Sequence, residues 1–200
     1  EAVDLDTNPN GTITFSGGLD LTTTSDEAFR AVDGGTINVA NAGTETINTT
    51  SGTGLLLDGV TSGTGINFDS IDITGLAVAG ASGIDINNFS GSLNVAGGTI
   101  TNNGSTASVI QITETAAGTG TGNITIDTNV TSTAGASPGF AVEVSNVRGG
   151  AINFGGNFVD TNFNNSGGIR VSNLTTAATT VNFTGNVQAN TGGAEAVDLD

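Results

Sequence analysis

Short apolar alternations that return at a regular interval are the feature that most constrains this chain. Three-residue segments with apolar first and third positions recur throughout the sequence, for example Ile37–Val39, Ile66–Phe68 and Ile152–Phe154. Alternation with a period of two is typical of β-strands that bury one face. No ten-residue stretch has a convincing helical period, so the sequence predicts an all-β fold of many short strands.

The alternating segments fall into three series that keep a common phase. A second and a third series follow the first, and corners rich in Gly, Asn and Ser separate the segments. Each turn of 26–32 residues therefore offers three strands, which predicts a parallel β-helix of about seven turns with three faces. The first series places its apolar pairs at Val3/Leu5, Phe29/Ala31, Leu55/Leu57, Ile84/Ile86, Ile110/Ile112, Val142/Val144, Ile169/Val171 and Val197/Leu199.

Two other folding classes compete with a β-helix for a chain of this kind. A β-sandwich also uses short alternating strands, but it does not require them to repeat in groups of three. Intrinsic disorder suits the many small polar residues, but it requires few aliphatic and β-branched residues, and here these recur in every turn. The common phase of the three series favours the β-helix over both.

The same six residues, EAVDLD, stand at Glu1–Asp6 and at Glu195–Asp200, 194 residues apart. This repetition predicts that residues 1–200 are a single solenoid segment and represent one 194-residue period of a tandem array. We expect the partners of such a segment to be further copies of itself, joined end to end either covalently or in a fibre.

The charge of the chain argues against two classes of partner. Three basic residues stand against 19 acidic ones, which gives a formal net charge of -16. A surface of that sign repels nucleic acids and anionic lipid headgroups. No apolar run approaches the ~20 residues of a spanning helix, so we expect neither nucleic-acid binding nor membrane insertion. Cysteine is absent, which excludes disulfides and thiolate metal sites.

An asparagine column occupies the outward middle position of the second series. Its members are Asn38, Asn67, Asn94, Asn153 and Asn182, with Thr14 and Thr125 in the two remaining places. Stacked amides can hydrogen-bond to one another along the axis, and the same flat polar face could bind a glycan. The inward positions beside it should form one buried column of Phe15, Val39, Phe68, Val95, Ile126, Phe154 and Phe183.

Calcium is the one cofactor for which the chain offers ligands, because Ca²⁺ prefers carboxylate and carbonyl oxygens. The candidate residues are Asp4 and Asp6, in the stretch DLDTNPNG, and Asp69 and Asp72. The first stretch departs from an EF-hand loop, since Pro9 stands where the loop glycine belongs and Phe15 where the bidentate glutamate belongs. The acidic residues therefore have two interpretations, calcium corners or a solvated surface.

A polysaccharide-cleaving enzyme is the alternative that requires two neighbouring carboxylates. Asp58 and Asp85 lie on adjacent turns and form the one such pair in the outward columns of the first series. The chain lacks Trp and Tyr for sugar stacking, and it lacks His and Lys for general base catalysis. We therefore predict no catalysis.

The repeat texture resembles that of a known class of proteins. Stretches such as GTINVANAGTETINTTSGTGLLLDGV (Gly35–Val60) and GINFDSIDITGLAVAGASGIDINN (Gly65–Asn88) resemble the right-handed parallel β-helix repeats of very large bacterial surface proteins, described as β-strand-repeat, adhesin-like or filamentous-haemagglutinin-like. The resemblance implies a right-handed coil, an extracellular or cell-surface location, and a structural or adhesive stalk. A carbohydrate-binding solenoid face is the first alternative function, and a polysaccharide lyase or hydrolase is the second.

Overall fold

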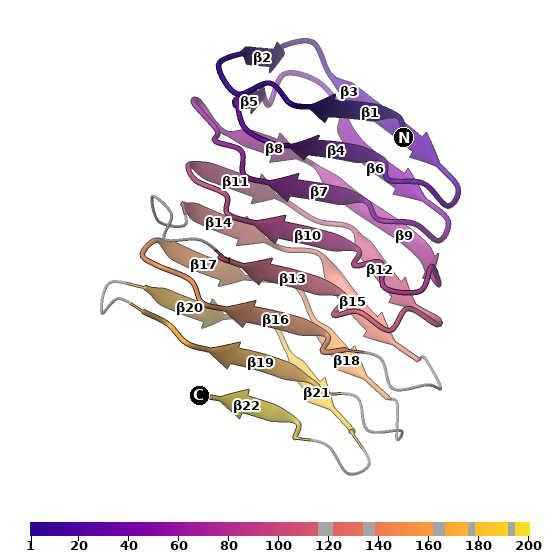
Figure 1. Ribbon diagram of the computed structural model, residues 1–200. Helices are drawn as coiled ribbons and strands as arrows, with labels where there is room; N and C mark the ends of the chain where they lie inside the picture. The colour runs from indigo at the N-terminus through magenta and orange to yellow at the C-terminus, as the bar shows by residue number, and fades with distance from the viewer. Residues whose placement is uncertain (116–121, 134–138, 162–166, 176–178, 192–194) are drawn as a thin grey trace.

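The strands stack into three parallel sheets that the chain visits in a fixed order (Figure 1). The computed structural model describes residues 1–115, 122–133, 139–161, 167–175, 179–191 and 195–200. Every regular element in these ranges is a β-strand. Each strand inside a sheet pairs with the strands three before and three after it, so the predicted three-faced parallel β-helix is confirmed.

The first sheet has eight strands, all parallel. They are β1 (Val3–Asp6), β4 (Phe29–Val32), β7 (Leu55–Asp58), β10 (Ile84–Asn87), β13 (Ile110–Thr113), β16 (Val142–Ser145), β19 (Ile169–Ser172) and β22 (Val197–Leu199). Their bounds contain the eight apolar pairs of the first predicted series.

The second and third sheets have seven strands each. The second contains β2 (Thr12–Phe15), β5 (Thr36–Val39), β8 (Ile66–Phe68), β11 (Ser92–Val95), β14 (Asn123–Ile126), β17 (Ala151–Phe154) and β20 (Thr180–Phe183). The third contains β3 (Leu19–Thr23), β6 (Glu45–Thr49), β9 (Ser70–Leu76), β12 (Thr99–Asn102), β15 (Asn129–Ser132), β18 (Phe158–Asp160) and β21 (Val187–Ala189). We call one strand from each sheet, in chain order, a rung.

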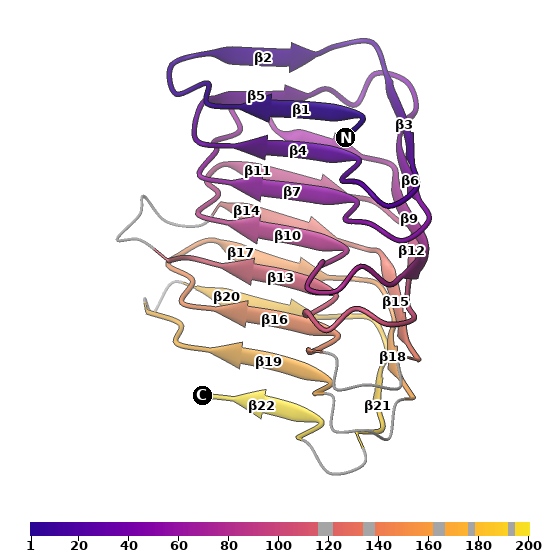
Figure 2. The same ribbon diagram turned by 45° about the vertical axis from the view of Figure 1, so that its right-hand side comes forward.

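The coil is right-handed and makes about six turns. In Figure 1 the first-sheet strands run leftward in front, the second-sheet strands run rightward behind them, and the chain returns along the third sheet while it descends. Figure 2 brings the third sheet forward as a side wall. Because seven stacked strands are separated by six steps, the seven strands of the second sheet enclose about six complete turns.

The corner after the first sheet is built from residues in the left-handed backbone region. Thr7, Asp33, Asn88, Asn146 and Asn173 each directly follow a first-sheet strand and have φ between 49° and 59°. Asn and Asp tolerate this region better than other side chains, because their short polar groups can bond locally. Gly59, with φ of 66°, takes the same place after β7, so six of the seven corners that follow β1 to β19 share this bend.

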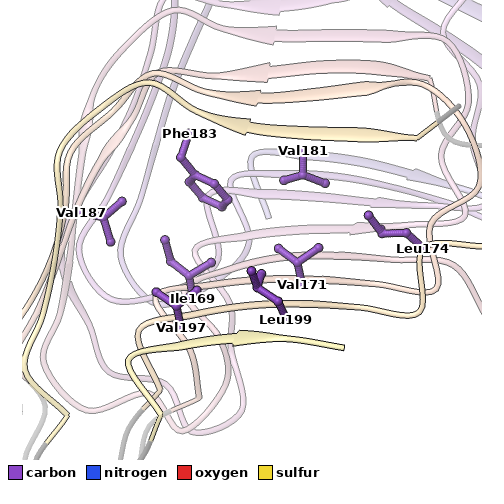
Figure 3. A pocket seen from close by; sticks show the side chains of 8 residues that line it. All are labelled: Ile169, Val171, Leu174, Val181, Phe183, Val187, Val197 and Leu199. Carbon is purple, nitrogen blue, oxygen red and sulfur yellow. The ribbon is translucent and has the colours of Figure 1, made fainter. Parts of the chain in front are cut away.

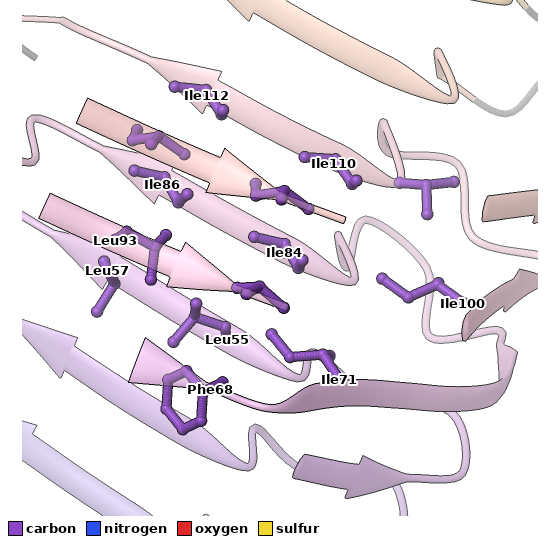
Figure 4. Close-up of a cluster of buried hydrophobic side chains, with 14 of the residues drawn as sticks. Leu55, Leu57, Phe68, Ile71, Ile84, Ile86, Leu93, Ile100, Ile110 and Ile112 are labelled. Carbon is purple, nitrogen blue, oxygen red and sulfur yellow. The ribbon is translucent and has the colours of Figure 1, made fainter. Parts of the chain in front are cut away.

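One hydrophobic core runs along the axis between the three sheets. Figure 4 shows side chains from all three sheets pointing to the common centre, among them Leu55 of the first sheet, Phe68 of the second and Ile71 of the third. These three are at most 1% exposed. Phe68 also meets Phe29 edge to face at 5.6 Å between ring centroids. Each inner rung is therefore covered by the rungs on either side of it.

The second sheet changes register between β5 and β8. Val39 pairs with Ile66, and Phe68 lies two positions further along. Thr61 forms an isolated bridge to Thr36 and accepts a hydrogen bond from the Ile37 N–H at 2.8 Å. Residues 62–65 thus form a bulge between two paired stretches. The prediction of one unbroken buried column was wrong at this step, because Val39 and Phe68 are not opposite each other.

We predict that Phe68→Ala destabilises the protein by about 3–5 kcal/mol, because the side chain is fully enclosed and the cavity cannot collapse. Phe183→Ala, in the same sheet but only partly buried, should cost clearly less. Urea unfolding followed by circular dichroism measures both values. Equal costs for the two variants would contradict the observed difference in burial.

Candidate functional site

A polar column follows the outward face of the second sheet over five successive rungs. Asn67 pairs with Asn94, Asn94 with Thr125, Thr125 with Asn153, and Asn153 with Asn182. The Asn182 amide donates to the Asn153 side-chain oxygen at 2.9 Å, whereas the Asn67 amide donates to the Val39 carbonyl at 2.8 Å. The structure therefore brings four of the five predicted asparagines into one column, with mixed hydrogen-bond partners.

Asn38 does not belong to this open column. Its side chain is only 6% exposed, and its oxygen accepts the backbone N–H groups of Gly63 and Thr64 at 2.9 and 2.7 Å. Its amide donates to the Thr14 hydroxyl at 3.2 Å. The predicted position of Asn38 on an open glycan face is thus corrected. This side chain satisfies the backbone of the 62–65 bulge.

The predicted calcium ligands Asp4 and Asp6 already hold a cation from the chain itself. The Arg30 guanidinium lies on the next strand, 2.6 Å from the Asp4 carboxylate and 3.4 Å from that of Asp6. The Thr7 hydroxyl donates to Asp6 at 2.6 Å and, together with Arg30, lowers the pKa of Asp6. These two carboxylates form an ion pair with arginine in this structure.

The other two predicted calcium ligands, Asp69 and Asp72, each accept a hydrogen bond from a different backbone N–H group. Asp69 accepts the N–H of Glu45 at 3.1 Å, and Asp72 accepts that of Thr99 at 2.9 Å. Asp72 also lines a shallow polar hollow of about 140 Å³ on the third sheet, together with Asn48 and five threonines. Within the described ranges, no three His, Cys, Asp or Glu side chains gather into a metal site.

Glu45 is a buried carboxylate that the sequence analysis missed. It is the first residue of β6 and is 1% exposed, and its Oε1 accepts the N–H of Ala42 at 3.1 Å. Among the described residues, its Oε2 has no hydrogen-bond partner. The place of Glu45 opposite Leu19, at an inward position of the third sheet, is the one signal that could have identified it.

Asp58 and Asp85, the carboxylates considered for catalysis, lie on neighbouring strands without facing each other. Asp85 pairs with Leu56, while Asp58 pairs with Asn87. Burial raises the pKa of Asp85 to about 6, and repulsion from Asp58 adds to the effect. Asp85 thus prefers its neutral form at mildly acidic pH, because its carboxylate lies between Leu56 and Gln111 in the outward column.

The outward column of the first sheet alternates in charge near both ends. Arg170 lies between Glu143, at 3.9 Å, and Asp198, at 3.3 Å, and Arg30 lies against Asp4 in the same way. Read singly, each arginine looks like an isolated cation. The sequence feature that could have revealed the column is the spacing between each arginine and an acidic residue. This spacing is 26 to 28 residues, which places the two side chains one rung apart.

No family model matches the sequence, and neither a curated protein nor a solved structure matches it. None of the described residues belongs to a helix long and apolar enough to cross a membrane. The parallel β-solenoid with three sheets is therefore established by the structure itself. Membership of the bacterial surface-protein class stays a prediction.

We predict that Asn38→Ala destabilises the protein by about 1–3 kcal/mol, because the N–H groups of Gly63 and Thr64 lose their acceptor. Asn94→Ala, from the open column, should change the free energy of unfolding by less than about 0.5 kcal/mol. Denaturant titrations of the two variants test this difference. Similar costs would show that Asn38 has no special role in the bulge.

Asp85 should make the protein less stable as the pH rises from about 4 to about 6. Its folded pKa is about 6, above the ordinary 3.8, so the folded state keeps a proton that the unfolded state releases in this window. Asp85→Asn removes this effect. We expect the variant to be more stable than the parent above pH 6, and the difference to vanish near pH 4.

Urea titrations of the parent, Asp85→Asn and Asp58→Asn between pH 4 and 8 measure this dependence. Asp58→Asn serves as the comparison, because it removes only the smaller cause of the shift and should flatten the profile less. A stability difference between parent and Asp85→Asn that stays constant over this range would contradict the raised pKa of Asp85.

Proposed function

We propose that this segment is a structural spacer, a stiff solenoid whose length separates whatever lies at its two ends. The observation that carries the proposal is the single hydrophobic core that passes through every rung. Each inner strand is hydrogen-bonded to equivalent strands above and below, so bending the axis would open backbone bonds and expose apolar side chains at once. Eight stacked first-sheet strands span about 34 Å at the usual interstrand spacing.

The outward surface supports a spacer rather than a compact binding module. It carries small polar residues and a formal net charge of -16, which favours solubility of an extended object. The asparagine column and the ion pairs, such as that of Arg30 with Asp4, are spread over many rungs instead of converging on one cavity. Adhesion and an extracellular or cell-surface location are part of the proposal, and the resemblance of the repeat texture alone supports them.

A spacer built from equivalent rungs should tolerate the removal of one rung. Deletion of residues 84–109 takes out β10, β11 and β12 and brings Ile110 to the place that Ile84 holds opposite Leu55. Inward residues then still meet inward residues in all three sheets. We expect this variant to fold and to be shorter by about 4.8 Å.

The length change can be measured by the distance between two spin labels. The chain has no cysteine, so labels attach only at introduced positions, and Thr12→Cys and Thr180→Cys place them on exposed residues of β2 and β20. The matched control is deletion of 84–110, one residue more, which turns Gln111 inward and should prevent folding. A chain that unfolds on deletion of 84–109, or that folds but keeps its length, would overturn the spacer proposal.

A further inference from the structure

The corner between the second and third sheets carries a feature that the spacer function does not explain. Glu45 begins β6 on the inward side of the third sheet, and its side chain is 1% exposed. One carboxylate oxygen, Oε1, accepts the N–H of Ala42, whereas Oε2 has no hydrogen-bond partner among the described residues. A buried polar atom without a partner costs free energy, because it has lost its bonds to water and gained none in the protein.

The inward residues next to Glu45 are apolar. Leu19 pairs with Glu45 from the rung before it, and Ile47, the next inward residue of β6, is fully buried. Figure 3 shows the same apolar character at this corner of the last rung, where Phe183 of β20 and Val187 of β21 both face the interior. None of the ion pairs between described residues includes Glu45. Its buried charge therefore requires a compensating group from outside the chain.

A second carboxylate lies against the same residue from the next rung. Asp69 directly follows β8, and its Oδ2 accepts the Glu45 N–H at 3.1 Å. In return, the Asp69 N–H donates to the Glu45 carbonyl oxygen at 2.7 Å. The Asp69 side chain is exposed, whereas that of Glu45 is enclosed. This corner thus holds two acidic side chains, one on the inner side and one on the solvent side.

The corner before β6 gives a small ion a route to the buried carboxylate. Residues 41–44 are all exposed. Gly43, one of them, lies beside the carboxylate, since a Cβ at this position would be 3.8 Å from Glu45 Oε1. Only a short, exposed stretch of chain therefore separates the Glu45 side chain from solvent.

We infer that this corner binds a calcium ion, with Glu45 Oε2 as the buried ligand and Asp69 as the ligand on the solvent side. The ion supplies both a partner for Oε2 and a charge opposite to the two carboxylates. Ca²⁺ suits this site better than Mg²⁺, because it takes about 6–8 oxygen ligands in irregular geometry, so that backbone carbonyls and water complete its shell. With only two carboxylates, we expect a Kd on the order of 10⁻⁴ M.

Calcium titrations of the full chain test the site by two readouts. Isothermal titration calorimetry measures affinity and stoichiometry, and thermal unfolding followed by circular dichroism, with calcium or with a chelator, measures stabilisation. Both are carried out in about 0.15 M KCl, which screens the general attraction of the acidic surface for cations. We expect one saturable site per chain and a melting temperature that rises with calcium. Mg²⁺ at the same concentration should give a clearly smaller rise.

Glu45→Gln and Asp69→Asn each remove one ligand, and Asp127→Asn is the matched control. Asp127 directly follows β14 as Asp69 follows β8, but no acidic residue lies between Val95 and Thr99 on the rung before it. We expect the Kd for Ca²⁺ to rise at least about tenfold in the first two variants, because each loses a charged oxygen ligand. The control should bind calcium as the parent does.

The exposed ligand keeps the test decisive if Glu45→Gln does not fold, because Asp69→Asn changes a side chain on the surface. Absence of saturable binding to the folded parent would overturn the site, and so would an affinity that Asp69→Asn leaves unchanged. Equal weakening by Asp127→Asn, or an equal effect of Mg²⁺, would also overturn it. The spin-label distances are measured without calcium, so they decide the spacer function separately.

Discussion

Parallel backbone pairing between successive turns is the interaction on which the rest of this structure depends. It fixes the spacing of the rungs, so each inward side chain must find its counterpart directly above and below. The requirement explains why the corners are so uniform. A left-handed residue such as Asp33, Asn88 or Asn146 directly follows every first-sheet strand from β1 to β19 except β13, and it returns the chain to the same place in those turns. Small changes of turn length are then absorbed in the remaining corners.

The bulge in the second sheet shows how the stack accommodates a local irregularity. Residues 62–65 stand opposite only two residues of β5, so two extra residues shift the pairing by two positions, which keeps inward residues inward because the side-chain period of a strand is two. The N–H groups that lose their partners there are bound by the Asn38 side chain. A residue that looked like one member of a repeating surface column is therefore a specific structural support.

The sequence was sufficient to predict the class of fold, the three series of strands and most pairings, because alternation and spacing are local patterns. It could not predict the register shift, since Thr61 has no apolar alternation around it and is paired only through its backbone. The same limit explains Glu45 and Asp85. Whether a carboxylate is exposed depends on neighbours one rung away, and a reading of single residues treats both as surface charges.

The parallel direction of every pairing gives the two ends of the stack different shapes and chemistry. A contact between two like ends would need antiparallel pairing, whereas a contact between unlike ends continues the existing direction. Contacts between unlike surfaces repeat without closing when their rotation does not return to the start. A series of such contacts would have polarity but no last member.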